Sequence, residues 1–250
     1  MGMILTLGFI TLITSIIAGV IGFGGGMLLI AILPLFLSPS IIIPIHGITQ
    51  IASNASRMFF SLSDVQWHLF PAFLIGSVLG TIVFSLALFN IPLQFLPVAI
   101  ACYLLLNLWS KTFGAFIKKF ESYYLIGFLQ TGLGLIVGAP GPLALSVLTK
   151  ELESNDQIIS TSAMFMTISH LAKIPVYLAI TPFLSDSLLL ISVMIVCAIA
   201  GSFLGTKLRI KADNDKIILL IKIALSSLAV HMLASSLVGQ IMPLDLPTYR

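Results

Sequence analysis

Eight apolar stretches, separated by short polar links, run along almost the whole chain. Except for the longer first stretch, each has about the length that crosses the ~30 Å hydrocarbon core of a membrane as a helix. They cover residues 3–37, 41–62, 69–89, 93–109, 123–148, 158–180, 188–206 and 217–238. The pattern predicts an all-α polytopic membrane protein with a single transmembrane domain over residues 1–250.

The first stretch is interrupted by a glycine run, Gly22-Phe23-Gly24-Gly25-Gly26. Glycine weakens a helix, so the backbone is expected to open here. Open backbone at bilayer depth is tolerated only where it is buried in protein or lines a wet cavity. Gly24, Gly25 and Gly26 are therefore candidate binding residues. The alternative is a packing face, because small residues let transmembrane helices approach closely.

The second half of the chain repeats the features of the first. A shift of 116 residues aligns two glycines, a serine, a polar side chain and a cation of the two halves. The aligned pairs are Gly22 with Gly138, Gly25 with Gly141, Ser53 with Ser169, Asn54 with His170, and Arg57 with Lys173. We therefore predict two homologous halves, at about residues 3–110 and 123–240. Secondary transporters are commonly built from such repeats, and interrupted segments at matching positions mark the binding site.

A hexapeptide of the form Gly-Ser-x-Leu-Gly-Thr also occurs twice, at residues 76–81 and 201–206. Its two glycines have the GxxxG spacing that brings transmembrane helices into close contact. This motif is predicted to pack helices rather than to bind a ligand.

Positive charges gather in two of the links between apolar stretches. They are Lys111, Lys118 and Lys119 in one link, and Lys207, Arg209, Lys211 and Lys216 in the other. Both links are expected on the cytoplasmic side, yet three apolar stretches separate them. The conflict disappears if both interrupted stretches are re-entrant. The predicted fold is thus an inverted repeat, in which each half has a glycine-interrupted, re-entrant segment plus three transmembrane helices and both termini face outside. Residues 3–37 would measure about 52 Å as one helix, which fits a pair of half-helices better than one crossing.

Among the cations inside apolar stretches, Arg57 and Lys173 occupy matched positions of the two halves. A charge at bilayer depth costs roughly 3 kcal/mol or more, so each marks a candidate functional site. Polar neighbours share the helix face of each cation, Asn54 with Arg57 and His170 with Lys173. The alternative is snorkelling, in which a long side chain near a helix end reaches the membrane interface.

No Asp or Glu lies within an apolar stretch. A buried cation without a countercharge would repel a cationic substrate, so the pattern favours a small anion. Half-helices that begin after the glycine runs would add N-terminal N–H groups to the site. The predicted substrate-binding residues are Gly24, Gly25, Gly26, Ser53, Asn54, Arg57, Gly138, Gly141, Ser169, His170 and Lys173.

Composition agrees with this interpretation and excludes several others. Hydrophobic residues make up 58% of the chain and charged residues 8%, far from the roughly 25% charged fraction of a soluble domain. The net charge of +3 is too small to indicate a nucleic-acid partner. Cys102 and Cys197 stand alone, and no metal-ligand spacing or paired carboxylates are present, so no cofactor and no enzymatic activity are predicted. His170 is a candidate proton carrier, with a hydrogen bond to a neighbouring helix as the alternative. His46 offers no argument beyond packing.

At these residues the chain resembles the sulfite exporter TauE/SafE family, bacterial permeases implicated in moving sulfite, sulfoacetate and other anions. The shared features are the Gly-x-Gly-Gly-Gly run at residues 22–26, the Asp-Val-Gln-Trp link at residues 64–67, and the glycine spacing of Gly76 and Gly80. The second run, residues 138–142, departs from the full glycine triplet. The resemblance implies a multi-pass permease of the bacterial cytoplasmic membrane.

The leading hypothesis is a secondary transporter of a small anion, a sulfur oxyanion or organosulfonate such as sulfite, that works by alternating access. Its expected partners are the anion and the lipid bilayer, and a homodimer is left open. The alternative function is that of a non-transporting membrane subunit or assembly partner of a larger complex. In that case the buried cations would pair with acidic groups on another protein.

Overall fold

The computed structural model describes the chain except for residues 118–120, 141–142, 181–184, 210–213 and 242–250. The described residues form helices and connecting turns, with no strand. The α-helices are α1 (Gly2–Ile21), α2 (Gly25–Ile32), α3 (Pro39–Phe60), α4 (Phe70–Leu88), α5 (Leu96–Trp109), α6 (Lys111–Ile117), α7 (Tyr123–Val137), α8 (Leu145–Glu151), α9 (Asn155–Leu171), α10 (Lys173–Ile180), α11 (Leu188–Leu208) and α12 (Asn214–Ile241). Short 3₁₀ turns occupy Leu33–Leu35, Leu62–Asp64, Trp67–Leu69, Leu93–Phe95 and Ser185–Ser187.

The first apolar stretch breaks at its glycine run, as the sequence predicts. Helix α1 ends at Ile21, and Gly22 and Gly24 follow with φ angles of +92° and +86°. These left-handed angles are strained for any residue with a Cβ. Helix α2 then folds back on α1 so closely that a Cβ on Gly25 would overlap the carbonyl oxygen of Thr14. The expectation of two half-helices needs one correction, because α1 has 20 residues and is long enough to span a membrane.

The second apolar stretch breaks as well. Helix α7 ends at Val137, and Gly138 has a φ of +73°. Helix α8 returns along α7, because the Ala144 N–H donates to Gln130 Oε1 at 3.1 Å and the Tyr123 hydroxyl donates to a carboxylate oxygen of Glu151 at 2.6 Å. Gly141 lies outside the described residues.

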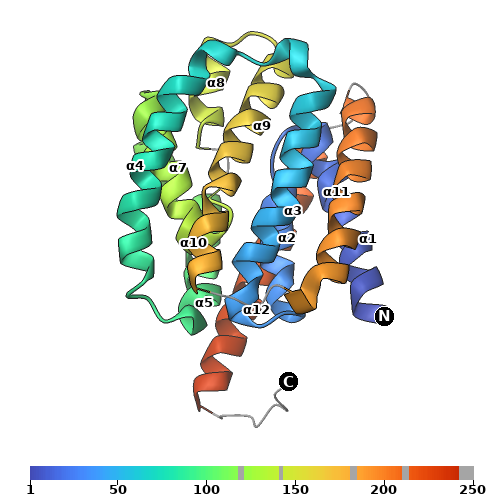
Figure 1. Cartoon of the computed structure of the whole chain (residues 1–250), viewed down its shortest axis with the longest axis vertical. Helices are drawn as coiled ribbons and strands as arrows, with labels where there is room; N and C mark the ends of the chain where they lie inside the picture. Colours follow the sequence, from blue (N-terminus) through green and yellow to red (C-terminus); the bar gives the residue numbers. More distant parts are fainter. Residues whose placement is uncertain (118–120, 141–142, 181–184, 210–213, 242–250) are drawn as a thin grey trace.

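The two most extensive helix–helix interfaces join segments that are far apart in the sequence. Helix α1 packs along α11, and α4 packs along α7 (Figure 1). A Cβ on Gly201 or Gly205 would overlap backbone carbonyls of α1, and a Cβ on Gly76 or Gly80 would overlap those of α7. The predicted packing role of both hexapeptides is therefore confirmed by contact.

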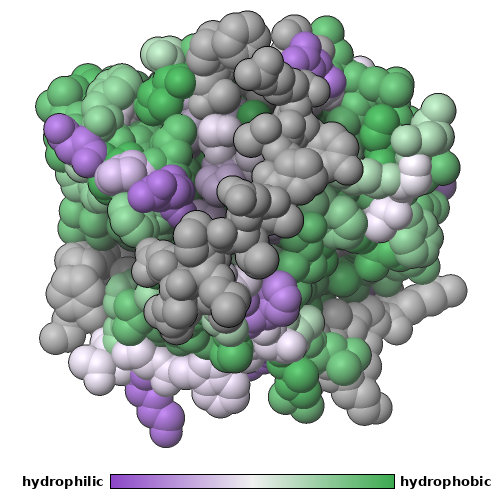
Figure 2. All heavy atoms as spheres, turned by 90° about the horizontal axis from the view of Figure 1, so that it is seen from below, coloured by the Kyte–Doolittle hydropathy of each residue, from purple (hydrophilic) through white to green (hydrophobic). Residues whose placement is uncertain are grey.

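Five helical segments of the described chain are long and apolar enough to cross a membrane. They are Gly2–Ile21, Trp67–Leu88, Asn155–Ile180, Leu188–Leu208 and Ile218–Ser236. Large apolar side chains such as Leu86, Val196 and Leu220 are exposed on their outer faces, and the described residues at the rim of the molecule seen from below are mostly hydrophobic (Figure 2). An outer surface of this kind suits a bilayer, and the chain is a multi-pass membrane protein.

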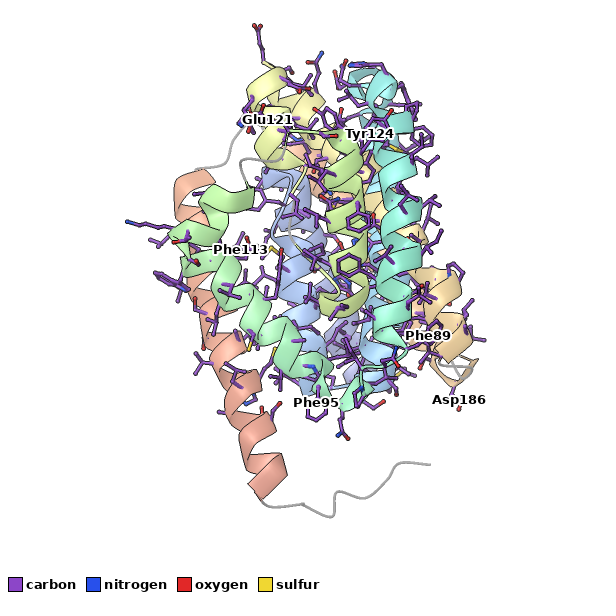
Figure 3. All side chains as sticks on the ribbon, turned by 90° about the vertical axis from the view of Figure 1, so that its left-hand side faces the viewer. Phe89, Phe95, Phe113, Glu121, Tyr124 and Asp186 are labelled. Carbon is purple, nitrogen blue, oxygen red and sulfur yellow. The ribbon has the colours of Figure 1, made fainter. Side chains whose placement is uncertain are left out.

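Helices α3 and α9 form the centre of the bundle and carry most of its buried polar side chains. Helix α3 contacts α9, α10 and α11, while α5 packs against α12. Figure 3 shows Glu121 and Tyr124 at one end of the bundle and Phe89, Phe95 and Asp186 at the other. Helix α4 ends at the same end of the bundle at which α11 begins, so these two helices run in opposite directions.

Candidate functional site

Arg57 is buried on α3, with only 2% of its surface exposed. Its Nη1 donates to the carbonyl oxygen of Ala18 at 2.6 Å, and its Nη2 donates to Asn54 Oδ1. Its Nε has no hydrogen-bond partner among the described residues. The side chain points into the bundle, which excludes snorkelling for this residue.

Lys173 is also enclosed, with 0% of its surface exposed. Its Nζ donates to the carbonyl oxygen of Gly138 and lies 2.9 Å from His170 Nδ1. A Cβ on Gly134 would come within 3.0 Å of Lys173 Cε, so the stem of the lysine is tightly packed. Snorkelling is excluded here too.

The two cations share two kinds of hydrogen-bond contact. Each is hydrogen-bonded to the polar residue three positions earlier, Asn54 for Arg57 and His170 for Lys173. Each also donates to a carbonyl at the end of a broken helix, α1 for Arg57 and α7 for Lys173. The C-terminal carbonyls of a helix carry partial negative charge, so these contacts stabilise the cations without a carboxylate. The sequence had predicted helix N-termini beside the cations and had not predicted these C-terminal contacts.

A cavity of about 20 Å³ lies between Arg57 and the first glycine turn. Its lining residues are Ala18, Gly22, Phe23, Gly24, Gly26, Met27, Gln50, Asn54, Arg57, Ala139 and Met166. Because α2 begins at Gly25, its first turn lies at this cavity, and N–H groups of a first turn have no partner within their own helix. The volume is enough for about one water molecule, so an oxyanion would need the cavity to widen.

The predicted glycines divide between two roles. Gly24 and Gly26 line the cavity, whereas Gly25 packs against α1. Gly138 packs against side chains of the first half, since a Cβ there would come within 2.7 Å of Ile30 Cδ1. Its carbonyl, rather than its N–H, faces Lys173.

Ser53 and Ser169 lie in helix contacts away from the cavity lining. The Ser53 hydroxyl is 3.1 Å from the hydroxyl of Ser202, on the second hexapeptide. Ser169 is 3.0 Å from the Thr131 hydroxyl, which donates to Ser77 on the first hexapeptide. Each serine is thus linked to the hexapeptide of the other half, and neither serine is among the residues that line the cavity.

His46 is a central residue that the sequence interpretation assigned to packing alone. Its Nε2 lies 2.9 Å from the Gly26 carbonyl oxygen, and its ring meets that of His170 edge to face, with centroids 5.5 Å apart. Gln50, the next polar residue on this face of α3, lines the cavity. The spacing of His46, Gln50, Asn54 and Arg57 along one helix face is the signal that could have identified the whole set.

The described residues hold no group of three or more His, Cys, Asp and Glu side chains that could bind a metal ion. Their buried polar side chains include Arg57, Lys173, His46 and His170 and no carboxylate. The arrangement therefore presents positive charge without a buried carboxylate among the described residues, which attracts negative charge.

Comparison with known proteins gives one match. The sequence matches the family described as Sulfite exporter TauE/SafE over residues 7–232. No curated protein and no solved structure matches the chain. The match covers every candidate site residue.

Proposed function

The chain belongs to the sulfite exporter TauE/SafE family of membrane permeases, and we propose that it is a secondary transporter of a small anion. The proposed substrate class is a sulfur oxyanion or an organosulfonate such as sulfite. The proposed location is the bacterial cytoplasmic membrane, with the anion and the lipid bilayer as partners. A homodimer stays a prediction.

One observation carries the proposal: two cations are buried in the bundle, and no carboxylate is buried among the described residues. Substrate cations would be repelled from such a site, whereas an anion supplies the missing negative charge. Arg57 offers the forked donor geometry that suits oxyanions. Asn54, Gln50 and the first turn of α2 would add hydrogen bonds at the cavity.

Alternating access by two inverted halves fits this arrangement. The support is that α1 packs on α11 while α4 packs on α7, so each half supplies a helix to the other. The matched contacts of Arg57 and Lys173 and the opposite directions of α4 and α11 agree with an inverted repeat over residues 3–110 and 123–240. Relative movement of such halves would widen the cavity for the anion.

Cysteine labelling tests the inverted topology. In a background with Cys102→Ser and Cys197→Ser, single cysteines are placed at the exposed positions Glu121, Lys207, Asn90 and Asp186. We expect Glu121→Cys and Lys207→Cys to react with a membrane-impermeant maleimide only from the cytoplasmic side, and the other two only from outside. Labelling of Glu121→Cys and Lys207→Cys from opposite sides would contradict the topology.

Flux through the purified protein tests the function itself. In liposomes without any partner protein, we expect uptake of at least one anion among sulfite, sulfate, thiosulfate and short sulfonates, measured against empty liposomes. Such uptake would exclude the alternative of a non-transporting subunit, because that role needs another protein. Absence of uptake for every anion in the panel would favour the subunit.

A further inference from the structure

The two central imidazoles lie outside the cavity lining and contact the first glycine turn and Lys173. His46 and His170 are both buried, and their rings meet where α3 crosses α9. His46 contacts the first glycine turn through Gly26, and His170 contacts Lys173. The pair therefore connects the turn that lines the cavity with the cation of the second half.

The hydrogen-bond partners define where each ring carries its proton. Lys173 as an ammonium can only donate, so His170 Nδ1 accepts and its proton is on Nε2. The carbonyl of Gly26 can only accept, so His46 Nε2 carries a proton and, in the neutral ring, Nδ1 has a free lone pair.

The two remaining nitrogens are complementary. His170 Nε2 is a donor and His46 Nδ1 an acceptor, and neither has a hydrogen-bond partner among the described residues. With centroids 5.5 Å apart, ring nitrogens turned toward one another would be separated by roughly 3 Å, which is hydrogen-bond distance. In the edge-to-face arrangement the two nitrogens are not hydrogen-bonded to each other, and one bridging water would join them while the contacts with Gly26 and Lys173 remain.

We propose that His46 and His170 form a proton relay between Lys173 and the first glycine turn, and that the relay couples anion transport to protons. The proposal rests on the proposed anion transport. In the transfer, the Lys173 ammonium gives a proton to His170 Nδ1, and His170 gives its Nε2 proton to His46 Nδ1. Lys173 becomes a neutral amine, His170 stays neutral in its other tautomer, and His46 becomes an imidazolium.

The transfer moves one positive charge toward the cavity. The nearby charged groups are Lys173 and Arg57, which both act on His170; Tyr103 and Tyr177 donate their hydroxyl protons to the carbonyls of Pro140 and Leu135 in the segment around Gly138. None of these groups carries a negative charge near neutral pH. A charged His46 beside Gly26 would attract an anion in the cavity, and the anion would in turn stabilise that charge. Anion binding and protonation are then linked reciprocally.

Two conservative variants remove the relay while keeping the structural hydrogen bonds. The amide nitrogen of His46→Gln can still donate to Gly26, and the amide oxygen of His170→Asn can still accept from Lys173, but neither side chain passes a proton on. His68→Gln, at an exposed position, is the matched control. The assay uses liposomes that contain a pH-sensitive dye, a clamped membrane potential, and sulfate, thiosulfate or methanesulfonate, which remain ionised near neutral pH.

We expect wild type and His68→Gln to move protons together with the anion, and both relay variants to move at least about tenfold fewer protons per anion. For a variant without flux, proton uptake on anion binding is measured by calorimetry in buffers of different ionisation enthalpy, and is expected to be lost. Unchanged proton coupling in both variants would overturn the relay. Anion flux without protons in wild type would overturn the relay and leave the transport proposal standing, whereas absence of both flux and binding would overturn both.

Discussion

Arg57→Gln is expected to lower anion transport by about tenfold to a hundredfold. The guanidinium lines the cavity, and hydrogen bonds to a charged group are each worth about 1.5–3 kcal/mol, where every 1.4 kcal/mol is a factor of ten. The loss should appear mainly as weaker anion binding, because Arg57 would contact the anion directly. Initial uptake rates and dissociation constants for the transported anion measure it.

The Arg57→Gln protein should still fold. Burying a charge is costly, so its removal offsets part of the loss of the contacts with Ala18 and Asn54. Arg57→Lys keeps the charge but loses the fork, and we expect intermediate transport. Arg209→Gln is the matched control: Arg209 also contacts the end of α1, through Gly19, and pairs with Asp156 at the edge of the bundle. Wild-type flux in Arg57→Gln, with Arg209→Gln also normal, would remove Arg57 from the site.

Several features of the fold could be predicted from local sequence. Glycine is the residue that readily adopts the positive φ angles observed at Gly22, Gly24 and Gly138. The positions of the two helix breaks could therefore be predicted from the glycines. The places of Arg57 and Lys173 within apolar stretches made burial one of two alternatives, and their contacts inside the bundle exclude snorkelling. The GxxxG spacing located the helix contacts because close approach needs glycine wherever the helices pack.

Other features depend on contacts between distant segments. The hydroxyls of Ser53 and Ser202 meet across 149 positions of sequence, so a serine expected at the substrate was found in a helix contact. Besides Asn54 and His170, the cations donate to the backbone carbonyls of Ala18 and Gly138, and backbone carbonyls carry no sequence signal. For His46, the contact with His170 depends on how α3 crosses α9, and periodicity within one helix does not determine a crossing.

The two cations are matched in the repeat but differ in surroundings. Arg57 lines a cavity and retains an unpartnered Nε, whereas Lys173 is enclosed by Gly138, His170 and the backbone near Gly134. We infer that Arg57 binds the anion and that Lys173 supplies charge behind the site. This difference makes the effects of replacing them distinguishable.

Lys173→Gln is expected to lower transport at least about tenfold, with a smaller effect on anion affinity than Arg57→Gln. The amide can still hydrogen-bond to Gly138 or His170, so the fold is retained. The ammonium group, with its positive charge and the proton that it would give to His170, is lost. Lys207→Gln, at an exposed position, is the matched control and should transport normally. Uptake rates, anion dissociation constants and thermal unfolding in detergent together separate loss of charge from loss of structure.

Two further variants, Arg57→Lys and Lys173→Arg, keep a positive charge at each position but change its shape. Arg57→Lys should retain part of the activity, because the smaller ammonium side chain keeps the positive charge at the cavity. Lys173→Arg should not, because a guanidinium is larger than an ammonium and the stem of Lys173 already packs within 3.0 Å of the place that a Cβ on Gly134 would occupy. Full activity of Lys173→Arg, or flux of Lys173→Gln within about twofold of wild type, would show that charge at this position is not needed for the transport cycle.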